Sequence, residues 1–262
     1  MNFSALQLNG RLVSNIQKQQ LTTLTAVQEQ AIPAIIAGKD CLVIAPTGTG
    51  KTEAFAIPIV QLLLEKEKRE QPSVLILLPT RQLCIQTKNR IAKLIEGTSL
   101  ELVCFYGGST YESQLKNYPK AQLILATPGR LLDFLGQQLV DLNAVDTLVI
   151  DEFDQLLDLG FALEINKIMQ ALSAQRQSIF VSATRTPEMD KIIHKRLKNP
   201  IEIIIGDQLK RGKISEYVLY VDKNDKKNLI RYLLENRIKS QVLIFARTVH
   251  AVERIGTDLH RN

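Results

Sequence analysis

The sequence predicts an α/β fold in which a mainly parallel sheet is sandwiched between layers of helices. Short apolar runs recur along the chain, and longer amphipathic stretches separate them. Runs that are both short and apolar on both faces are typical of strands covered by helices on each side. Strands that alternate with helices join in parallel through right-handed crossovers.

The elements follow in order along the first four fifths of the chain. The predicted strands are residues 41–45, 74–78, 102–105, 123–126, 147–150, 179–181 and 201–205. Amphipathic stretches at 81–95 and 162–172 predict helices between them. We therefore assign residues 1–207 to one sandwiched α/β domain.

The last part of the chain predicts an incomplete second domain. Gly206 and Asp207 end the last apolar run, and the polar, basic stretch 208–215 is typical of a linker. The pattern then begins again as strand 216–221, helix 225–236, strand 241–245 and a helix from Thr248. About 50 residues are too few for an α/β domain of ordinary size, so we expect 208–262 to hold a linker and the start of a second domain.

Composition excludes several classes of protein. Hydrophobic residues make up 45% and charged residues 23% of the 262, which excludes collagen-like, coiled-coil and wholly disordered chains. No apolar run approaches the roughly 18 residues that cross a bilayer, and the N-terminus lacks a secretion signal, so we expect no membrane partner. Cys41, Cys84 and Cys104 lie beside aliphatic residues without zinc or redox spacing, which predicts buried thiols and a cytoplasmic location.

Charge is distributed unevenly. The formal net charge is +6, yet residues 1–209 carry 21 basic and 21 acidic side chains, so residues 210–262 hold the whole excess. A basic segment indicates polyanion binding, although a solvated face is the commoner meaning of a mild excess.

The sharpest local motif lies between the first predicted strand and the following helix. It runs from Ala45 and Pro46 through Thr47, Gly48, Thr49, Gly50, Lys51 and Thr52. Glycines let backbone N–H groups converge on phosphate oxygens, and the helix N-terminus favours an anion. Lys51 would reach the β- and γ-phosphates, and the Thr52 hydroxyl would bind Mg²⁺. The alternative is an ordinary glycine-rich turn.

Two carboxylates follow the predicted strand 147–150. In a phosphate-loop enzyme, Asp151 at such a strand end would hold Mg²⁺ through water, and Glu152 would orient and deprotonate an attacking water. Acidic residues after a strand are also common helix caps, so the phosphate loop is what favours the catalytic interpretation.

Several motifs in order give the chain a resemblance to the DEAD-box RNA helicases. Asp151-Glu152-Phe153-Asp154 resembles motif II, and 45–52 resembles motif I, which normally begins with Ala. The other matching segments are Leu24–Gln28 with Phe3 (Q motif), Pro79–Leu83 (motif Ia), Gly107-Gly108, Thr127–Arg130 (motif Ib), Ser182–Thr184 (motif III) and Leu243–Thr248 (motif IV). The resemblance covers nearly the whole chain, and it implies a RecA-like domain in 1–207, with its Q-motif segment at about 1–30, and the start of a second RecA-like domain in 208–262.

The resemblance also implies the ligands and residue roles. ATP and Mg²⁺ would be the cofactors, with Thr25 and Gln28 reading the adenine and Phe3 packing against it. RNA would be gripped along its backbone, without sequence preference, by Thr80, Arg81, Gly108, Thr127, Gly129 and Arg130. Ser182 and Thr184 would hydrogen-bond toward Asp154 and couple the nucleotide state to domain closure. Simpler alternatives are core packing for Phe3, a plain turn for Gly107-Gly108, and helix capping for Ser182 and Thr184.

Some positions depart from the family pattern. Phe153 replaces the Ala of the tetrad and places a ring against the motif III strand, and Gln82 replaces a Glu. Gln20 and Leu21 stand where a Gly-aromatic pair is usual, and Leu24 stands in place of a Pro.

The implied function is an ATP-dependent RNA helicase, an ATP hydrolase that couples nucleotide turnover to local duplex unwinding or RNA–protein remodelling. The alternatives are a DNA-directed superfamily 2 helicase and a nucleotide-gated protein that clamps RNA without unwinding it. The 262-residue chain lacks the late arginine motif of a second RecA-like domain, so we expect it to be nearly inactive by itself. The particular RNA, the protein partners and the oligomeric state have no signature in the sequence.

Overall fold

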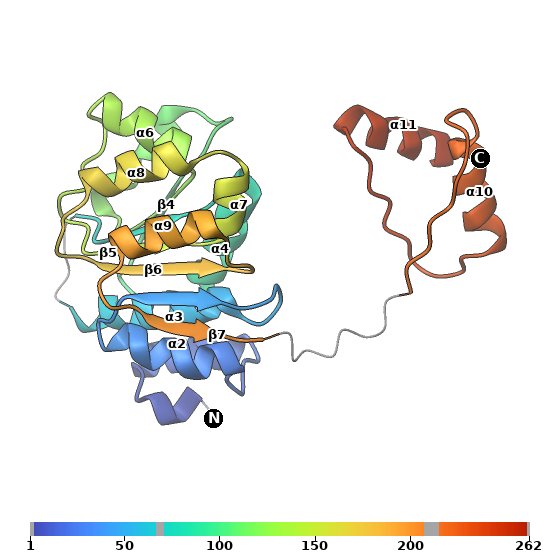
Figure 1. Cartoon of the computed structure of the whole chain (residues 1–262). Coiled ribbons are helices and arrows are strands. Elements are labelled where there is room, and N and C mark those ends of the chain that lie inside the picture. Colours follow the sequence, from blue (N-terminus) through green and yellow to red (C-terminus); the bar gives the residue numbers. More distant parts are fainter. Residues whose placement is uncertain (1–2, 67–70, 207–214, 261–262) are drawn as a thin grey trace. The chain divides into compact units, whose positions relative to one another are not determined.

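The computed structural model describes residues 3–66, 71–206 and 215–260. The chain divides into two compact units, residues 1–209 and 210–262 (Figure 1). Each unit is described by itself, and the predicted linker 208–215 lies almost wholly outside the described residues.

A seven-stranded sheet forms the centre of the first unit. Every strand pairs in parallel with its neighbours, in the order β3-β4-β2-β5-β6-β1-β7. The strands are β1 (Cys41–Ile44), β2 (Val74–Leu77), β3 (Leu102–Phe105), β4 (Leu123–Ala126), β5 (Thr147–Ile150), β6 (Gln177–Ser182) and β7 (Ile201–Ile204). All seven predicted strands are therefore confirmed, and so is the parallel α/β class.

Helices cover both faces of the sheet. The α-helices of the first unit are α1 (Gly10–Lys18), α2 (Ala26–Ile36), α3 (Lys51–Glu65), α4 (Arg81–Leu94), α5 (Tyr111–Leu115), α6 (Pro128–Gly136), α7 (Phe153–Asp158), α8 (Ala162–Ala171) and α9 (Pro187–Arg196), and the 3-10 helices are η1 (Phe3–Leu6) and η2 (Tyr118–Lys120). Figure 1 shows α8 and α9 on one side of the strands and α2 on the other. The helices predicted at 81–95 and 162–172 are α4 and α8.

Two hydrophobic clusters lie on opposite faces of the sheet. Successive strand residues point to opposite faces, so Val74 and Ile76 of β2 enter one cluster while Leu75 and Leu77 enter the other. The first cluster includes residues of α1 to α4, and the second includes residues of α6 to α9. This double burial is the reason that the strands read as continuous apolar runs.

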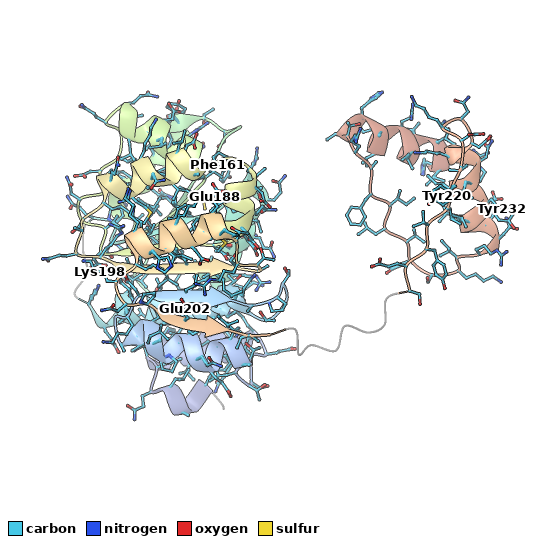
Figure 2. The ribbon with its side chains drawn as sticks, viewed as in Figure 1. Phe161, Glu188, Lys198, Glu202, Tyr220 and Tyr232 are labelled. Atoms are coloured by element: carbon cyan, nitrogen blue, oxygen red, sulfur yellow. The ribbon has the colours of Figure 1, made fainter. Side chains whose placement is uncertain are left out.

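The edge strand β7 is protected by charge. Its Glu202, which Figure 2 labels, accepts hydrogen bonds from Arg185 at 2.7 Å and 3.4 Å. Charged side chains on an edge strand disfavour pairing with another chain.

The three thiols are free, as the spacing of the cysteines predicts. Cys41 and Cys84 are buried and Cys104 is partly buried. Burial raises the pKa of Cys41 and of Cys104 to about 12. Among the described residues, no helix is long and apolar enough to cross a membrane.

The second unit contains the two predicted helices, α10 (Lys226–Asn236) and α11 (Val249–His260). The prediction of strands at 216–221 and 241–245 is wrong, because the described residues of this unit form no strand. A strand exists only where a neighbour supplies ladder hydrogen bonds, and neither segment has such a partner in the structure. Their apolar side chains are exposed instead, as Tyr220 is at 97% (Figure 2).

Gln20, which stands where the family usually has glycine, adopts a backbone conformation that is unfavourable for a residue with a Cβ. Its φ is +58°, in the left-handed region where glycine is favoured. The neighbouring Gln19, which caps the C-terminus of α1, has an ordinary φ of −85°. The glycine usual in the family would fit the conformation at position 20 without strain.

We expect Gln20→Gly to stabilise the first unit by about 1 kcal/mol, because it removes left-handed strain. For a domain of this size, that raises Tm by about 2–4 °C in a thermal unfolding measurement. Gln19→Gly is the matched control and should lower Tm, because it adds backbone freedom without relieving strain. Equal Tm changes in both variants would contradict the strain assigned to Gln20.

Candidate functional site

The predicted site residues after Gln28 lie at or just beyond the carboxyl ends of strands of the sheet. Because the strands are parallel, these ends share one edge. The loops after β5, β6 and β1, which are neighbours in the sheet, carry the phosphate and carboxylate motifs. The loops after β3, β4 and β2, also neighbours, carry the residues predicted to grip RNA. The strand order thus separates one edge into two adjacent sites.

The phosphate loop connects β1 to α3 through a tight turn. Gly48 and Gly50 have φ values of +83° and +88°, which favour glycine at both positions. The Thr49 hydroxyl donates to the Pro46 carbonyl oxygen at 2.7 Å and closes the turn. A Cβ at Gly50 would lie only 2.4 Å from Nε2 of Gln28, so this position requires glycine for space as well.

Lys51 has a buried ammonium group without a hydrogen-bond acceptor. Its side chain is 6% exposed, and no acceptor lies within hydrogen-bond distance of Nζ in the structure. The nearest opposite charge is Glu152, whose Oε1 lies 3.8 Å away. A buried cation without hydrogen-bond acceptors is costly, and the phosphates of a nucleotide would supply the missing acceptors. The residues present therefore fit a nucleotide.

Asp151 lies at the end of β5 and is buried. Burial, together with the charge of Glu152, raises the pKa of Asp151 to about 7. A cation beside this carboxylate would offset the cost of burying its charge. The described residues contain no cluster of three or more metal-binding side chains, and Mg²⁺ is commonly held by one or two carboxylates together with substrate phosphates. Asp151 and the Thr52 hydroxyl fit that manner of binding.

Glu152 stands between β5 and α7 in a left-handed conformation, with φ +50° and ψ +53°. Its N–H donates to Oδ1 of Asp151 at 3.0 Å. Non-glycine residues in this region are strained, and such strain is frequent at catalytic positions. Both carboxylates interact with the charge of Lys51: Oε1 of Glu152 lies 3.8 Å from its Nζ, and the lysine opposes the rise in the pKa of Asp151.

Asp154 contacts both motif III residues, as the resemblance implies. Its N–H donates to Oγ of Ser182 at 3.2 Å, and its Oδ2 accepts from the N–H and the hydroxyl of Thr184 at 2.9 Å and 2.7 Å. Burial raises the pKa of Asp154, but the hydrogen bonds from Thr184 and Ser182 outweigh it and leave the pKa below its usual value. The carboxylate is therefore held ionised between the two loops.

Both ends of the Gln28 side-chain amide form hydrogen bonds within the protein. It is 3% exposed; its Nε2 donates to the Gly50 carbonyl at 3.1 Å, and its Oε1 accepts from the Thr25 N–H at 3.0 Å. One amide hydrogen and one lone pair remain for a base. Phe3 is 4% exposed and belongs to the first hydrophobic cluster. This burial agrees with the alternative in which Phe3 packs in the core rather than against a base.

Arg81 contacts the glycine doublet 107–108 through a hydrogen bond. Thr80 caps α4 by accepting a hydrogen bond from the Leu83 N–H at 3.2 Å, and Arg81 begins that helix. The Arg81 guanidinium donates to the Gly108 carbonyl at 3.3 Å and lies 5.1 Å from the ring centroid of Tyr106. Gly108 has a φ of +82°, which places its carbonyl beside the arginine.

Arg130 makes the corresponding contact from α6. It donates to the Ser109 carbonyl at 3.2 Å, and its guanidinium carbon lies 4.8 Å from the Tyr111 ring centroid. Thr127 precedes this helix and donates its N–H to the Phe105 carbonyl at 2.9 Å. The two arginines, Gly108, Thr127 and the exposed Gly129 thus lie on three neighbouring loops.

The tyrosines Tyr106 and Tyr111 were missed as site residues. Each stacks against one of the two arginines. Their signal in the sequence is their position, directly before the glycine doublet 107–108 and three residues after it, because aromatic residues that flank a flexible turn can anchor it.

Among the departures from the family pattern, Gln82 is exposed on the first turn of α4, whereas Phe153 is fully buried. The Phe153 ring lies 5.0 Å from that of Phe180 in β6, so the predicted contact with the motif III strand is confirmed.

A cavity of about 1080 Å³ lies at the opposite edge of the sheet. Glu101, Gln122 and Pro72, which precede β3, β4 and β2, line it together with Tyr118 and Leu139. None of the predicted site residues lines this cavity, so it is separate from the site described above.

Comparisons with known proteins agree with this site. The family model of the DEAD/DEAH box helicases matches residues 25–192. The chain is 32% identical over 266 residues to the ATP-dependent RNA helicase RhlB of Vibrio vulnificus, which covers 98% of this chain and 61% of that protein. It is 34% identical over 271 residues to the ATP-dependent RNA helicase DBP3 of Saccharomyces cerevisiae, covering 100% of this chain and 51% of that protein.

A solved structure shows the same fold. The crystal structure of a DEAD box protein from the hyperthermophile Methanococcus jannaschii superposes with a TM-score of 0.76 at 27% identity, covering 100% of this chain and 70% of that one. The chain spans about half to three fifths of the two helicases named above. The family match extends over the phosphate loop, the carboxylates and motif III, and the chain therefore belongs to the DEAD/DEAH box helicase family.

Proposed function

We propose that the full-length protein is an ATP-dependent RNA helicase that couples ATP binding and hydrolysis to local RNA unwinding or RNA–protein remodelling. The observation that carries this proposal is the buried ammonium of Lys51, the first residue of α3. It has no hydrogen-bond acceptor, and its ion-pair partner Glu152 lies 3.8 Å away. The relatives RhlB and DBP3 are both named as ATP-dependent RNA helicases, which favours RNA over DNA as the polynucleotide.

In the proposed chemistry, Lys51 and the backbone of residues 47–50 bind the phosphates of ATP. Thr52 and Asp151 would hold Mg²⁺, which neutralises phosphate charge when bound. Glu152 orients the attacking water and accepts its proton at a carboxylate oxygen. We assign the adenine contacts to Thr25 and Gln28 and leave Phe3 to the hydrophobic core, because an almost fully buried ring has no free face for a base.

We propose that the loops after β3, β4 and β2 bind the RNA backbone. Thr80, Arg81 and Arg130 would contact phosphates, and the backbone at Gly108, Thr127 and Gly129 allows close approach of the strand. Contacts to phosphate and sugar position a nucleic acid without reading its sequence. The neutral charge balance of 1–209 agrees with a grip formed by a few groups rather than by a broad basic surface.

Asp154, Ser182 and Thr184 would couple the two ligands. Their hydrogen bonds join the loop after β5 to the loop after β6. We further propose that 1–207 is the N-terminal RecA-like domain and that 208–262 contains the linker and the start of the second. The free cysteines support a cytoplasmic location.

The general test uses the full-length protein. ATP turnover is measured with RNA and with DNA of equal length and sequence, alongside unwinding of a short duplex. The proposal predicts stimulation by RNA and unwinding. Equal stimulation by DNA would support a DNA-directed helicase, and tight RNA binding with background turnover would support a nucleotide-gated clamp.

We expect Glu152→Gln in the full-length protein to retain ATP binding and to lose at least about 10²-fold in turnover, because the general base is removed. Lys51→Ala should instead weaken nucleotide binding, because it removes a charge from the phosphates. Equilibrium binding and steady-state turnover separate the two effects. Normal hydrolysis by Glu152→Gln would show that another group activates the water.

Gln28→Ala should narrow the preference for ATP over GTP, because the amide's remaining donor and acceptor are lost. It should also weaken binding of both nucleotides, since the contact with the Gly50 carbonyl is lost. Gln28→Glu is the matched control, because it keeps an acceptor for Thr25 but loses the donor to Gly50. Competition binding with ATP and GTP provides the measurement; an unchanged preference in Gln28→Ala would remove this residue from adenine recognition.

Arg81→Ala and Arg130→Ala should each weaken RNA binding for all sequences and reduce the slope of log K against log salt by about 1, as loss of one phosphate contact does. Arg90→Ala is the control, because Arg90 lies on α4 like Arg81 but pairs with Glu53 at 2.5 Å. Fluorescence titrations at several salt concentrations measure the slope. A slope that changes as much in Arg90→Ala would contradict the assigned RNA surface.

A further inference from the structure

Phe153 follows the site carboxylates directly and is fully buried in the second hydrophobic cluster. Its ring centroid lies 5.0 Å from that of Phe180, and the two planes are tilted by 59°. Offset and tilted aromatic pairs stabilise a contact beyond the area they bury. The pair joins the start of α7 to β6, the strand that leads into Ser182.

Glu152 is a single strained residue between two fixed points. On one side, the Asp151 N–H donates to the Leu77 carbonyl at 3.0 Å, and Oδ1 of Asp151 accepts from the Glu152 N–H. On the other side, Phe153 is anchored in the core. A left-handed conformation costs free energy for a residue with a Cβ, so it persists only where the neighbours impose it.

The polar contacts between α7 and the motif III loop are one part-buried hydrogen bond, from the Asp154 N–H to Oγ of Ser182 at 3.2 Å, and two exposed ones. The hydrogen bonds of Thr184 to Asp154 lie at exposed positions, where water competes and the net contribution is small. Phe180 and Ser182 lie two residues apart on β6 and therefore face the same side of the sheet. The aromatic pair is thus the apolar, fully buried part of a junction whose polar contacts lie nearer the surface.

We propose that Phe153 is a positioning residue: anchored on Phe180, it holds Glu152 in the left-handed conformation that keeps its carboxylate within 3.8 Å of the Lys51 ammonium. This inference rests on the proposed function, in which Glu152 acts on the attacking water. Phe153 itself is fully buried in the second hydrophobic cluster, so it would contact neither the nucleotide nor the water. Loss of its ring would free the first turn of α7 and let Glu152 relax to an unstrained backbone.

The test uses RNA-stimulated ATP turnover of the full-length protein. Phe153→Leu should lower kcat by roughly 10-fold or more, since small displacements of a catalytic group cost up to about 10²-fold. KM for ATP and affinity for a non-hydrolysable ATP analogue should stay within about twofold. Phe180→Leu should reproduce the loss from the partner side, and Phe153→Met, which keeps a long apolar side chain that packs well on an aromatic ring, should recover most of the turnover.

Ile168→Ala is the matched control for stability. Ile168 is also fully buried in the second cluster, but it lies on α8, which carries none of the predicted site residues. Its Tm should fall at least as far as that of Phe153→Leu while kcat stays near the wild-type value. An equal loss of kcat in Ile168→Ala would overturn the proposal, because general destabilisation would then explain both.

Single-turnover rates in a Glu152→Gln background separate this inference from the proposed function. If Phe153 acts through Glu152, Phe153→Leu should cause no further loss once Glu152 has been replaced. The same fold-loss in both backgrounds would overturn the inference while leaving Glu152 as the base. Normal turnover by Glu152→Gln alone would instead contradict the proposed function, whatever Phe153 does.

Discussion

The parallel pairing of seven strands, with the inner strands buried on both faces, is the constraint on which the first unit depends. Parallel strands require crossovers, and the crossovers supply the helices that cover both faces. The same pairing brings the carboxyl ends of all strands to one edge. Every loop with a chemical motif therefore opens at that edge, whatever its distance along the chain.

Strand order then decides which loops meet. β6 lies between β5 and β1, so the motif III loop lies between the strand that leads to the carboxylates and the strand that leads to the phosphate loop. The contacts of Asp154 with Ser182 and Thr184, and of Phe153 with Phe180, are consequences of this placement. The loops that hold Arg81 and Arg130 lie on the other half of the same edge, which allows two ligands to share one scaffold.

The site contains several energetically unfavourable features. Lys51 is buried without a hydrogen-bond acceptor, Asp151 has a pKa raised by burial, and Glu152 has a left-handed backbone. Each of these features is unfavourable without a ligand, and the two hydrophobic clusters supply the stability that sustains them. A phosphate would supply acceptors for Lys51, and a cation would offset the buried charge of Asp151. The ligands that we propose would therefore remove these two unfavourable contributions to the free energy.

The strands of the first unit, the parallel class and the motif positions could be predicted from the local sequence pattern. Strands buried on both faces are continuous apolar runs, and phosphate binding requires glycines, Lys51 and Thr52 at a fixed spacing. The sequence by itself could not decide the strands expected at 216–221 and 241–245, since a strand depends on a partner that local pattern does not contain. Nor could it decide whether Phe3 packs against a base or the core, or that Gln28 braces Gly50. The resemblance predicted that Phe153 lies against the motif III strand, but its partner Phe180 and the 3.8 Å separation of Glu152 from Lys51 were decided by the folded chain. Those contacts join segments whose proximity is set by strand order rather than by neighbouring residues.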